Sequence, residues 1–91
     1  MDTEEQLTAQ IKLVINTLEN EYSKELNSGI LKLIYKRYLQ ALEILEKDKN
    51  IEELNIEGGV RAYLDAYSDY QNPLLDKMHK AEKILNNLKT T

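Results

Sequence analysis

Residues 30–46 decide the fold expected for this chain, and they read ILKLIYKRYLQALEILE. Apolar side chains recur in this stretch at steps of three and four, the spacing of one face of an α-helix. One stripe comprises Ile30, Ile34, Tyr38, Ala41 and Leu45, and an adjoining stripe comprises Leu31, Tyr35, Leu39 and Leu42. Two stripes indicate packing against more than one neighbour, so we expect this helix to be the most buried of the chain, with Leu39 in the core.

The segments on either side of this stretch carry the same helical spacing. A first helix is expected to begin after Thr3 and to end at Asn27-Ser28-Gly29, where the glycine tolerates a left-handed backbone. Gly58-Gly59 predicts a hinge before a third helix over residues 60–70, and Asn72-Pro73 predicts the cap and first position of a fourth. Four helices joined by short connections predict an all-α antiparallel four-helix bundle, with residues 1–91 forming a single domain.

The composition removes most classes of enzyme and cofactor site. The 91 residues include no cysteine and one histidine, so disulfides, thiolate chemistry and a structural zinc site are not expected, and no cofactor or metal is predicted. The N-terminal residues are acidic rather than apolar, and the apolar runs are far too short to cross a bilayer. We therefore expect a cytoplasmic protein.

Charge is segregated along the sequence. Residues 73–91 hold four basic and two acidic side chains, whereas residues 51–72 hold one basic and five acidic ones. Complementary charge between neighbouring helices of a bundle is one explanation, although single surface ion pairs contribute only about 0–1 kcal/mol. The other explanation is a binding surface formed by Lys77, Lys80 and Lys83, expected on the exposed side of the last helix and suited to an acidic partner or an anionic membrane. Nucleic acid is not an expected partner, because the net charge is −4.

Catalytic chemistry is not predicted, and no small-molecule substrate is expected. Six tyrosines without phenylalanine or tryptophan suit half-buried positions at the edge of a core, and His79 is expected to be a solvated helix residue. A helical enzyme of the chorismate mutase type remains an alternative at this length. That chemistry needs several cationic side chains around two substrate carboxylates, and the sequence has only Arg37 and Arg61 as arginines.

The order of these features resembles the enterocin A immunity family, whose members protect cells that produce pediocin-like (class IIa) bacteriocins. The likeness extends from about Leu7 to Leu88 and rests on three short segments rich in hydrophobic residues. They are the run Ile30-Leu31-Lys32-Leu33-Ile34-Tyr35-Lys36-Arg37-Tyr38-Leu39-Gln40-Ala41-Leu42, the helix opening Val60-Arg61-Ala62-Tyr63-Leu64, and the ending Ile84-Leu85-Asn86-Asn87-Leu88.

The resemblance implies a four-helix bundle without catalysis that gives bacteriocin immunity from inside the cell. Its implied partner is the mannose phosphotransferase membrane receptor with bound bacteriocin, reached at the inner membrane face through peripheral contact. The C-terminal half of such proteins carries much of the bacteriocin specificity, which in this sequence indicates Lys77, Lys80 and Lys83 as partner-binding residues. A small helical protein-interaction or regulatory module, acting as a dimer or on another protein's helix, is the main alternative.

Overall fold

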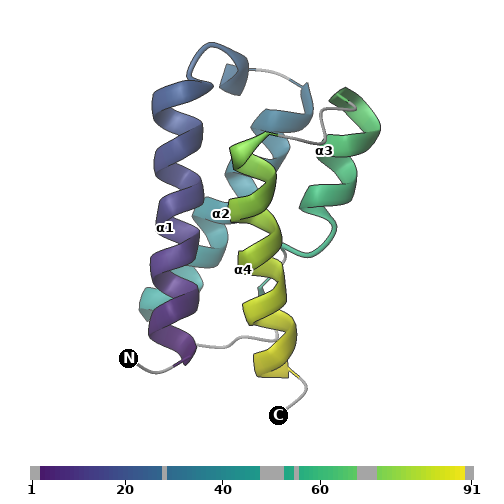
Figure 1. Cartoon of the computed structure of the whole chain (residues 1–91). Helices are drawn as coiled ribbons and strands as arrows, with labels where there is room; N and C mark the ends of the chain where they lie inside the picture. Colours follow the sequence, from purple (N-terminus) through teal and green to yellow (C-terminus); the bar gives the residue numbers. More distant parts are fainter. Residues whose placement is uncertain (1–2, 28, 48–52, 55, 68–71, 90–91) are drawn as a thin grey trace.

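Four α-helices and one short 3₁₀ turn form the part of the chain that this computed structural model describes, residues 3–27, 29–47, 53–54, 56–67 and 72–89. The helices are α1 (Thr3–Glu21), α2 (Gly29–Lys47), α3 (Gly59–Tyr67) and α4 (Pro73–Lys89), and the 3₁₀ turn η1 (Glu25–Asn27) lies between α1 and α2. Successive helices run in opposite directions, and α1 lies beside α4 (Figure 1). The predicted all-α antiparallel four-helix bundle is confirmed.

The core lies between apolar faces that all four helices contribute. The fully buried members from α1 and α4 are Leu7, Ile11, Val14, Leu18, Leu74, Met78, Ala81 and Leu85, all with no exposed surface. From α2 come Leu31, Ile34, Tyr38, Ala41 and Leu45, while Tyr63 of α3 and the preceding Leu54 and Ile56 close the remaining side. Complete burial of one leucine or isoleucine contributes about 1.5–3 kcal/mol, so these faces account for the association of the helices.

The expectation that α2 is the most buried helix is wrong. Seven residues of α1 are buried against five of α2. Besides α2, α1 packs against the 17-residue α4, whereas the other α-helix that contacts α2 is the nine-residue α3. The first stripe of α2 faces the core as expected, but Leu31 is the one fully buried member of the second stripe. Tyr35 and Leu42 are half-buried, and Leu39 keeps 39% of its surface exposed, so Leu39 is not a core residue.

Two glycines occupy the left-handed backbone region at bends of the chain. Gly29 has φ 78° and Gly58 has φ 90°, values that residues with a Cβ rarely adopt. Gly29 is the first residue of α2 and does not end the first helix, which already stops at Glu21. The chain instead turns early because the amide of Glu25 donates to the carbonyl of Tyr22, and η1 follows.

Apart from the end of α1, the helix boundaries expected from sequence hold within a few residues. α1 begins at Thr3 itself, and α3 begins at Gly59 and ends at Tyr67, whereas a helix over residues 60–70 was expected. The last part of that expectation, residues 68–70, lies outside the described residues. A Cβ at position 59 would lie 3.0 Å from Cε of Met78, so the glycine lets the start of α3 pack closely on α4.

Asn72 caps α4 and also joins it to two other helical segments. Its side-chain oxygen accepts a hydrogen bond from the amide of Leu74 at 2.8 Å, which confirms the predicted cap before Pro73. Its Nδ2 donates to the hydroxyl of Tyr63 at 2.7 Å and to the hydroxyl of Tyr22. One side chain therefore connects α4, α3 and the residue that follows α1 at the same end of the bundle.

Candidate partner-binding surface

Lys77 does not belong to the exposed surface on which the sequence placed it. Its ammonium donates to Oγ1 of Thr17 at 2.9 Å, and its backbone carbonyl accepts from Nε2 of Gln10 at the same distance. Both partners are on α1 and are themselves buried. Steps of three residues move about 60° around a helix, so three lysines at this spacing cover about 120° and the first turns toward α1.

Lys80 is exposed and borders the groove between α1 and α4. It lines a hollow of about 390 Å³ together with Gln6, Ala9, Gln10 and Ile84. Its lining combines the apolar side chains of Ala9 and Ile84 with two amide side chains. This surface can contact a partner through both hydrogen bonds and apolar packing, with one lysine charge at its edge.

Lys83 is exposed on the other side of α4, facing the start of α3. It lines a hollow of about 410 Å³ with Glu57, Gly58, His79, Glu82 and Asn86. His79 is exposed at its rim. Lys80 and Lys83 therefore lie on the exposed side of α4 beside different hollows, and they do not form one patch with Lys77. We call the exposed surface of α4 that carries Lys80 and Lys83 its outward ridge.

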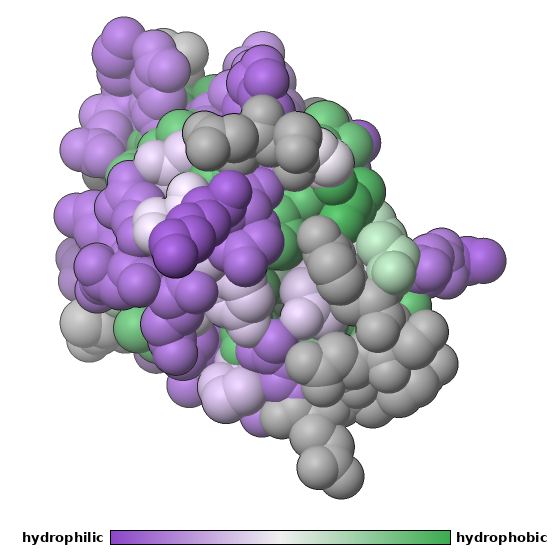
Figure 2. Space-filling view, turned by 90° about the horizontal axis from the view of Figure 1, so that it is seen from above, coloured by the Kyte–Doolittle hydropathy of each residue, from purple (hydrophilic) through white to green (hydrophobic). Residues whose placement is uncertain are grey.

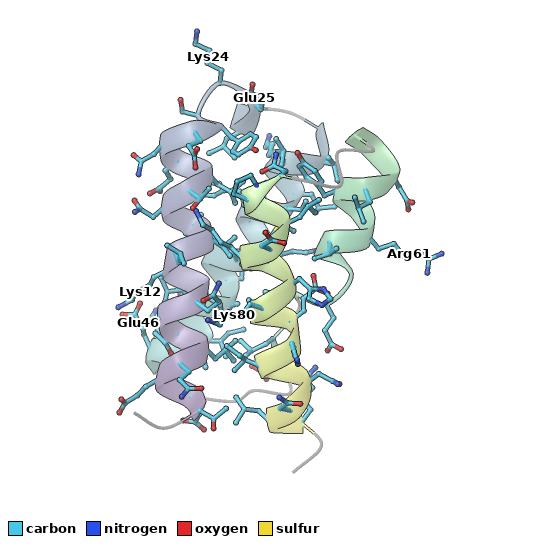
Figure 3. All side chains as sticks on the ribbon, viewed as in Figure 1. Lys12, Lys24, Glu25, Glu46, Arg61 and Lys80 are labelled. Carbon is cyan, nitrogen blue, oxygen red and sulfur yellow. The ribbon has the colours of Figure 1, made fainter. Side chains whose placement is uncertain are left out.

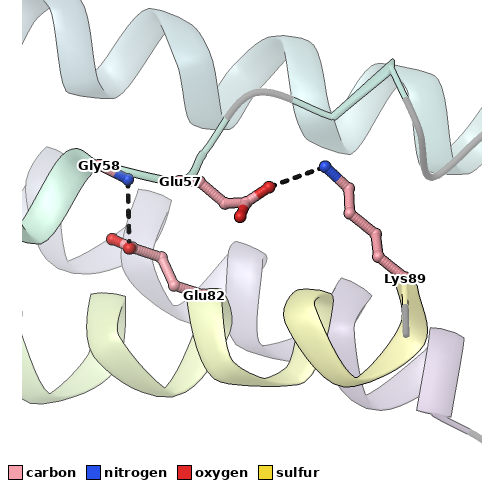
Figure 4. A network of polar contacts seen from close by, with 4 residues as sticks. All are labelled: Glu57, Gly58, Glu82 and Lys89. Atoms are coloured by element: carbon pink, nitrogen blue, oxygen red, sulfur yellow. Dashed lines mark hydrogen bonds and ion pairs between the residues drawn. The ribbon is translucent and has the colours of Figure 1, made fainter. Parts of the chain in front are cut away.

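The carboxylates of the second hollow hold α3 and α4 together. Glu82 accepts a hydrogen bond from the amide of Gly58 at 3.2 Å (Figure 4). It also accepts one from the amide of Val60 at 2.9 Å, and the two bonds satisfy free donors at the start of α3. Glu57 forms an ion pair with Lys89 at 2.7 Å. These groups carry out helix capping and pairing, which are structural tasks.

Tyrosine hydroxyls in the described part of the chain take part in helix packing. Tyr35 donates to Glu19 of α1 at 2.6 Å, and this hydrogen bond, with minor burial and the Glu19 charge, raises the pKa of the tyrosine. Tyr38 is 1% exposed and its hydroxyl has no hydrogen-bond partner in the described structure. Burial raises the pKa of Tyr38 strongly, and the negative charge of Glu82 adds to the effect. The expectation of half-buried tyrosines holds for Tyr22 and Tyr35, while Tyr38 and Tyr63 are core residues.

The two arginines lie on different helices. Arg37 is half-buried on α2, whereas Arg61 is exposed on α3 and extends away from the bundle (Figure 3). Within the described residues no group of three or more histidine, aspartate or glutamate side chains is placed to hold a metal ion. Across the same residues, no helix combines the length and apolarity that crossing a bilayer demands.

Two polar residues and an exposed apolar set were missed by sequence reasoning. Gln10 and Thr17 lie next to the apolar stripe of α1, one position before Ile11 and Leu18, and are buried by α4. A buried amide and hydroxyl need partners, so their position beside the stripe was the available signal. Leu13, Leu33 and Leu39 are the large apolar side chains left exposed in the described structure. In the end view of Figure 2 the side of α1 is mostly hydrophilic, and hydrophobic surface gathers toward α3.

Comparison with known proteins assigns the chain to a family. The family model described as "YeeD uncharacterised protein" matches residues 2–91. The chain belongs to the YeeD family. The protein named "Uncharacterized protein YeeD" from Bacillus subtilis (strain 168) is 33% identical over 93 residues, covering 93% of this chain and 91% of that protein. No solved structure matches the chain. These matches show the family alone, and the resemblance to the enterocin A immunity family stays a prediction.

Proposed function

We propose that this YeeD-family protein is a non-catalytic binding module that recognises another protein through the outward ridge of α4. The observation that carries the proposal is that some charged side chains of α4 bond to neighbouring segments of the fold while others remain exposed. Lys77 and Glu82 bond to α1 and to the start of α3, whereas Lys80 and Lys83 remain exposed beside two open hollows. The charged groups of Lys77 and Glu82 thus stabilise the fold. The charged groups of Lys80 and Lys83 face solvent, where a partner protein can contact them.

The proposed physiological role is immunity to a pediocin-like bacteriocin, which the resemblance implies. Under this proposal the protein acts in the cytoplasm and binds a mannose phosphotransferase-type receptor once the bacteriocin has engaged it. Lys80 and Lys83 also suit peripheral contact with the inner membrane face, since each lysine near anionic lipid contributes about 1 kcal/mol. Lys77 is removed from this proposed contact because its ammonium is occupied by Thr17.

The test is expression of the protein in the cytoplasm of a sensitive Gram-positive strain that is then challenged with a panel of pediocin-like bacteriocins. Survival should increase for at least one bacteriocin relative to cells with empty vector. The double variant Lys80→Glu with Lys83→Glu should lower this protection and leave folding intact, since exposed substitutions change stability by about 0.5 kcal/mol or less.

Lys24→Glu supplies a control for a charge reversal away from α4. Lys24 is exposed in the turn after α1, at the opposite end of the bundle from the C-terminus of α4 (Figure 3). The substitution reverses one charge and leaves the outward ridge of α4 unchanged. Equal killing of expressing and empty-vector cells would reject the immunity role. Protection that survives the double reversal would reject the ridge of α4 as the contact.

A further inference from the structure

The outward side of α2 carries a straight row of exposed residues whose charges change sign halfway along the helix. We call this row the α2 stripe, and it consists of Lys32, Lys36, Leu39, Glu43 and Glu46. The members follow one another at steps of four, three, four and three, and they fall within an arc of about 80° on the helix surface. That spacing is the one by which helices pair side by side in coiled coils.

The α2 stripe is unoccupied by the rest of the described chain. All five members are exposed, and Leu39 keeps 39% of its surface in solvent. Glu43 pairs only with the neighbouring Lys47, at 2.9 Å on the open surface, where both side chains are more than half exposed. Such an exposed pair contributes little and can be exchanged for another partner.

The order of charges makes the α2 stripe complementary to itself when reversed. We propose that two copies of this protein associate through antiparallel packing of their α2 stripes, with the two Leu39 side chains at the two-fold axis. Lys32 then faces Glu46 of the second copy, and Lys36 faces Glu43. A parallel arrangement would place lysine opposite lysine and glutamate opposite glutamate, so the charges select the antiparallel one.

The surface relief of α2 fits the same register. A hollow of about 230 Å³ is lined by Leu39, Leu42, Glu43, Glu46 and Lys47. The first four of these stand at positions i, i+3, i+4 and i+7, the four residues that form the hole for a side chain of a facing helix. In the proposed register Lys36 of the second copy enters this hole, with its alkyl stem against Leu39 and Leu42 and its ammonium between Glu43 and Glu46.

The packing leaves the outward ridge of α4 free, because α4 lies on the other side of the bundle from α2 (Figure 1). The inference is therefore independent of the function proposed for Lys80 and Lys83. A contact made by one helix from each copy is small, so the association should be reversible and weak enough to depend on protein concentration.

The experiment is sedimentation equilibrium of the full chain over a range of concentrations up to about 1 mM, where even weak association is populated. The wild-type protein should be a monomer–dimer mixture. Lys36→Glu places a carboxylate opposite Glu43 of the second copy, and Glu43→Lys places an ammonium opposite Lys36. Because each change sets like charges against each other, each single variant should associate at least about tenfold more weakly than wild type.

Mixing the two single variants should restore association. In the mixed dimer, one copy carries glutamate and the other lysine at each of the two facing pairs, so both pairs join opposite charges. Lys80→Glu makes the same change in net charge on α4 as Lys36→Glu makes on α2, and it should associate like wild type. A wild-type chain that stays monomeric at the highest concentration overturns the proposal. It is also overturned if the mixture associates no better than the separate variants. Circular dichroism spectra and melting temperatures of the two variants that match those of the wild type exclude misfolding as the cause of such a result.

Discussion

The interface between α1 and α4 and the outward side of α2 use the same helical spacing for opposite purposes. In the first, apolar residues at steps of three and four meet a second helix, and Gln10, Thr17 and Lys77 bond across the contact. In the second, the same steps bring charges and Leu39 into a row that meets solvent. Periodicity thus defines which residues share a face, and the neighbouring helices decide whether that face is a core or a surface.

The largest expected difference between the two regions comes from one substitution made in each. Leu85→Ala, in the face of α4 with no exposed surface, should lower the free energy of unfolding by about 2–5 kcal/mol, because it leaves a cavity in the core. Leu39→Ala should change it by less than about 1 kcal/mol, since the side chain is already partly in water. Urea denaturation of both variants makes the comparison. Similar losses at the two positions would show that the α2 stripe is a second core.

Substitutions of Asn72 can separate the contribution of its helix cap to stability from that of its hydrogen bonds to two tyrosines. Asn72→Ala should cost about 2 kcal/mol, because it removes the cap on Leu74 and leaves the hydroxyls of Tyr22 and Tyr63 without this donor. Asn72→Ser retains a capping oxygen but is too short to reach the tyrosines, so it should recover about half of that loss. The measurement is thermal unfolding by circular dichroism, and equal losses for Ala and Ser would assign the whole effect to the tyrosine contacts.

Tyr38 is the place where a polar group in the core has no compensating hydrogen bond in the described structure. Tyr38→Phe should therefore raise the free energy of unfolding by roughly 1 kcal/mol, since it removes a buried hydroxyl and keeps the ring. Denaturant unfolding at neutral pH gives the value. A loss of stability instead would mean that the hydroxyl is satisfied in solution, for example by an internal water.

The same residue predicts a pH dependence. The raised pKa of Tyr38 means that the folded protein favours the neutral hydroxyl, with burial as the main cause and the Glu82 charge as the second. This contribution to stability is present below the ordinary tyrosine pKa of about 10 and is lost as the pH rises from there toward the folded value. Unfolding free energies measured from pH 8 to about 11 should fall less steeply in Tyr38→Phe, with the remaining slope partly due to Tyr35.

The smallest effect separates two lysines on one helix. Lys77→Ala should cost about 0.5–1 kcal/mol, because it removes a half-buried hydrogen bond to Thr17, whereas Lys80→Ala should stay within about 0.5 kcal/mol. Thr17→Val removes the same hydrogen bond from the other side. Thermal unfolding of the variants gives the comparison. If Lys77→Ala lowers stability no more than Lys80→Ala does, the hydrogen bond to Thr17 contributes nothing and Lys77 behaves as the exposed residue predicted from the sequence.

Much of the fold was available from the sequence, because its signals are local. The cap at Asn72, the apolar stripes of α1 and α4 and the bend at Gly58 all depend on residues a few positions apart, and all were found. The burial of Leu39 and the exposure of Lys77 were misjudged for a common reason. Each depends on whether another helix lies against that side, which spacing along one helix cannot reveal.

The candidate site was predictable only in outline. Lys80 and Lys83 were expected on the exposed side of α4 and are there. The hollows beside them require the placement of Gln6 and Gly58, which are far away in the sequence. The capping of α3 by Glu82 was also unpredictable, since it joins an α4 side chain to amides more than twenty residues earlier.

The packing of α1 against α4 has a consequence for the order in which the protein is made and folded. These two helices are the first and the last of the bundle, and the hydrogen bond from Gln10 to the carbonyl of Lys77 spans 67 positions of sequence. While a ribosome is still synthesising residues 73–89, the apolar face of α1 lacks its principal cover. The nascent chain therefore completes its core only after release of the final helix, and until then α4 does not cover the apolar side chains of Leu7, Ile11 and Leu18.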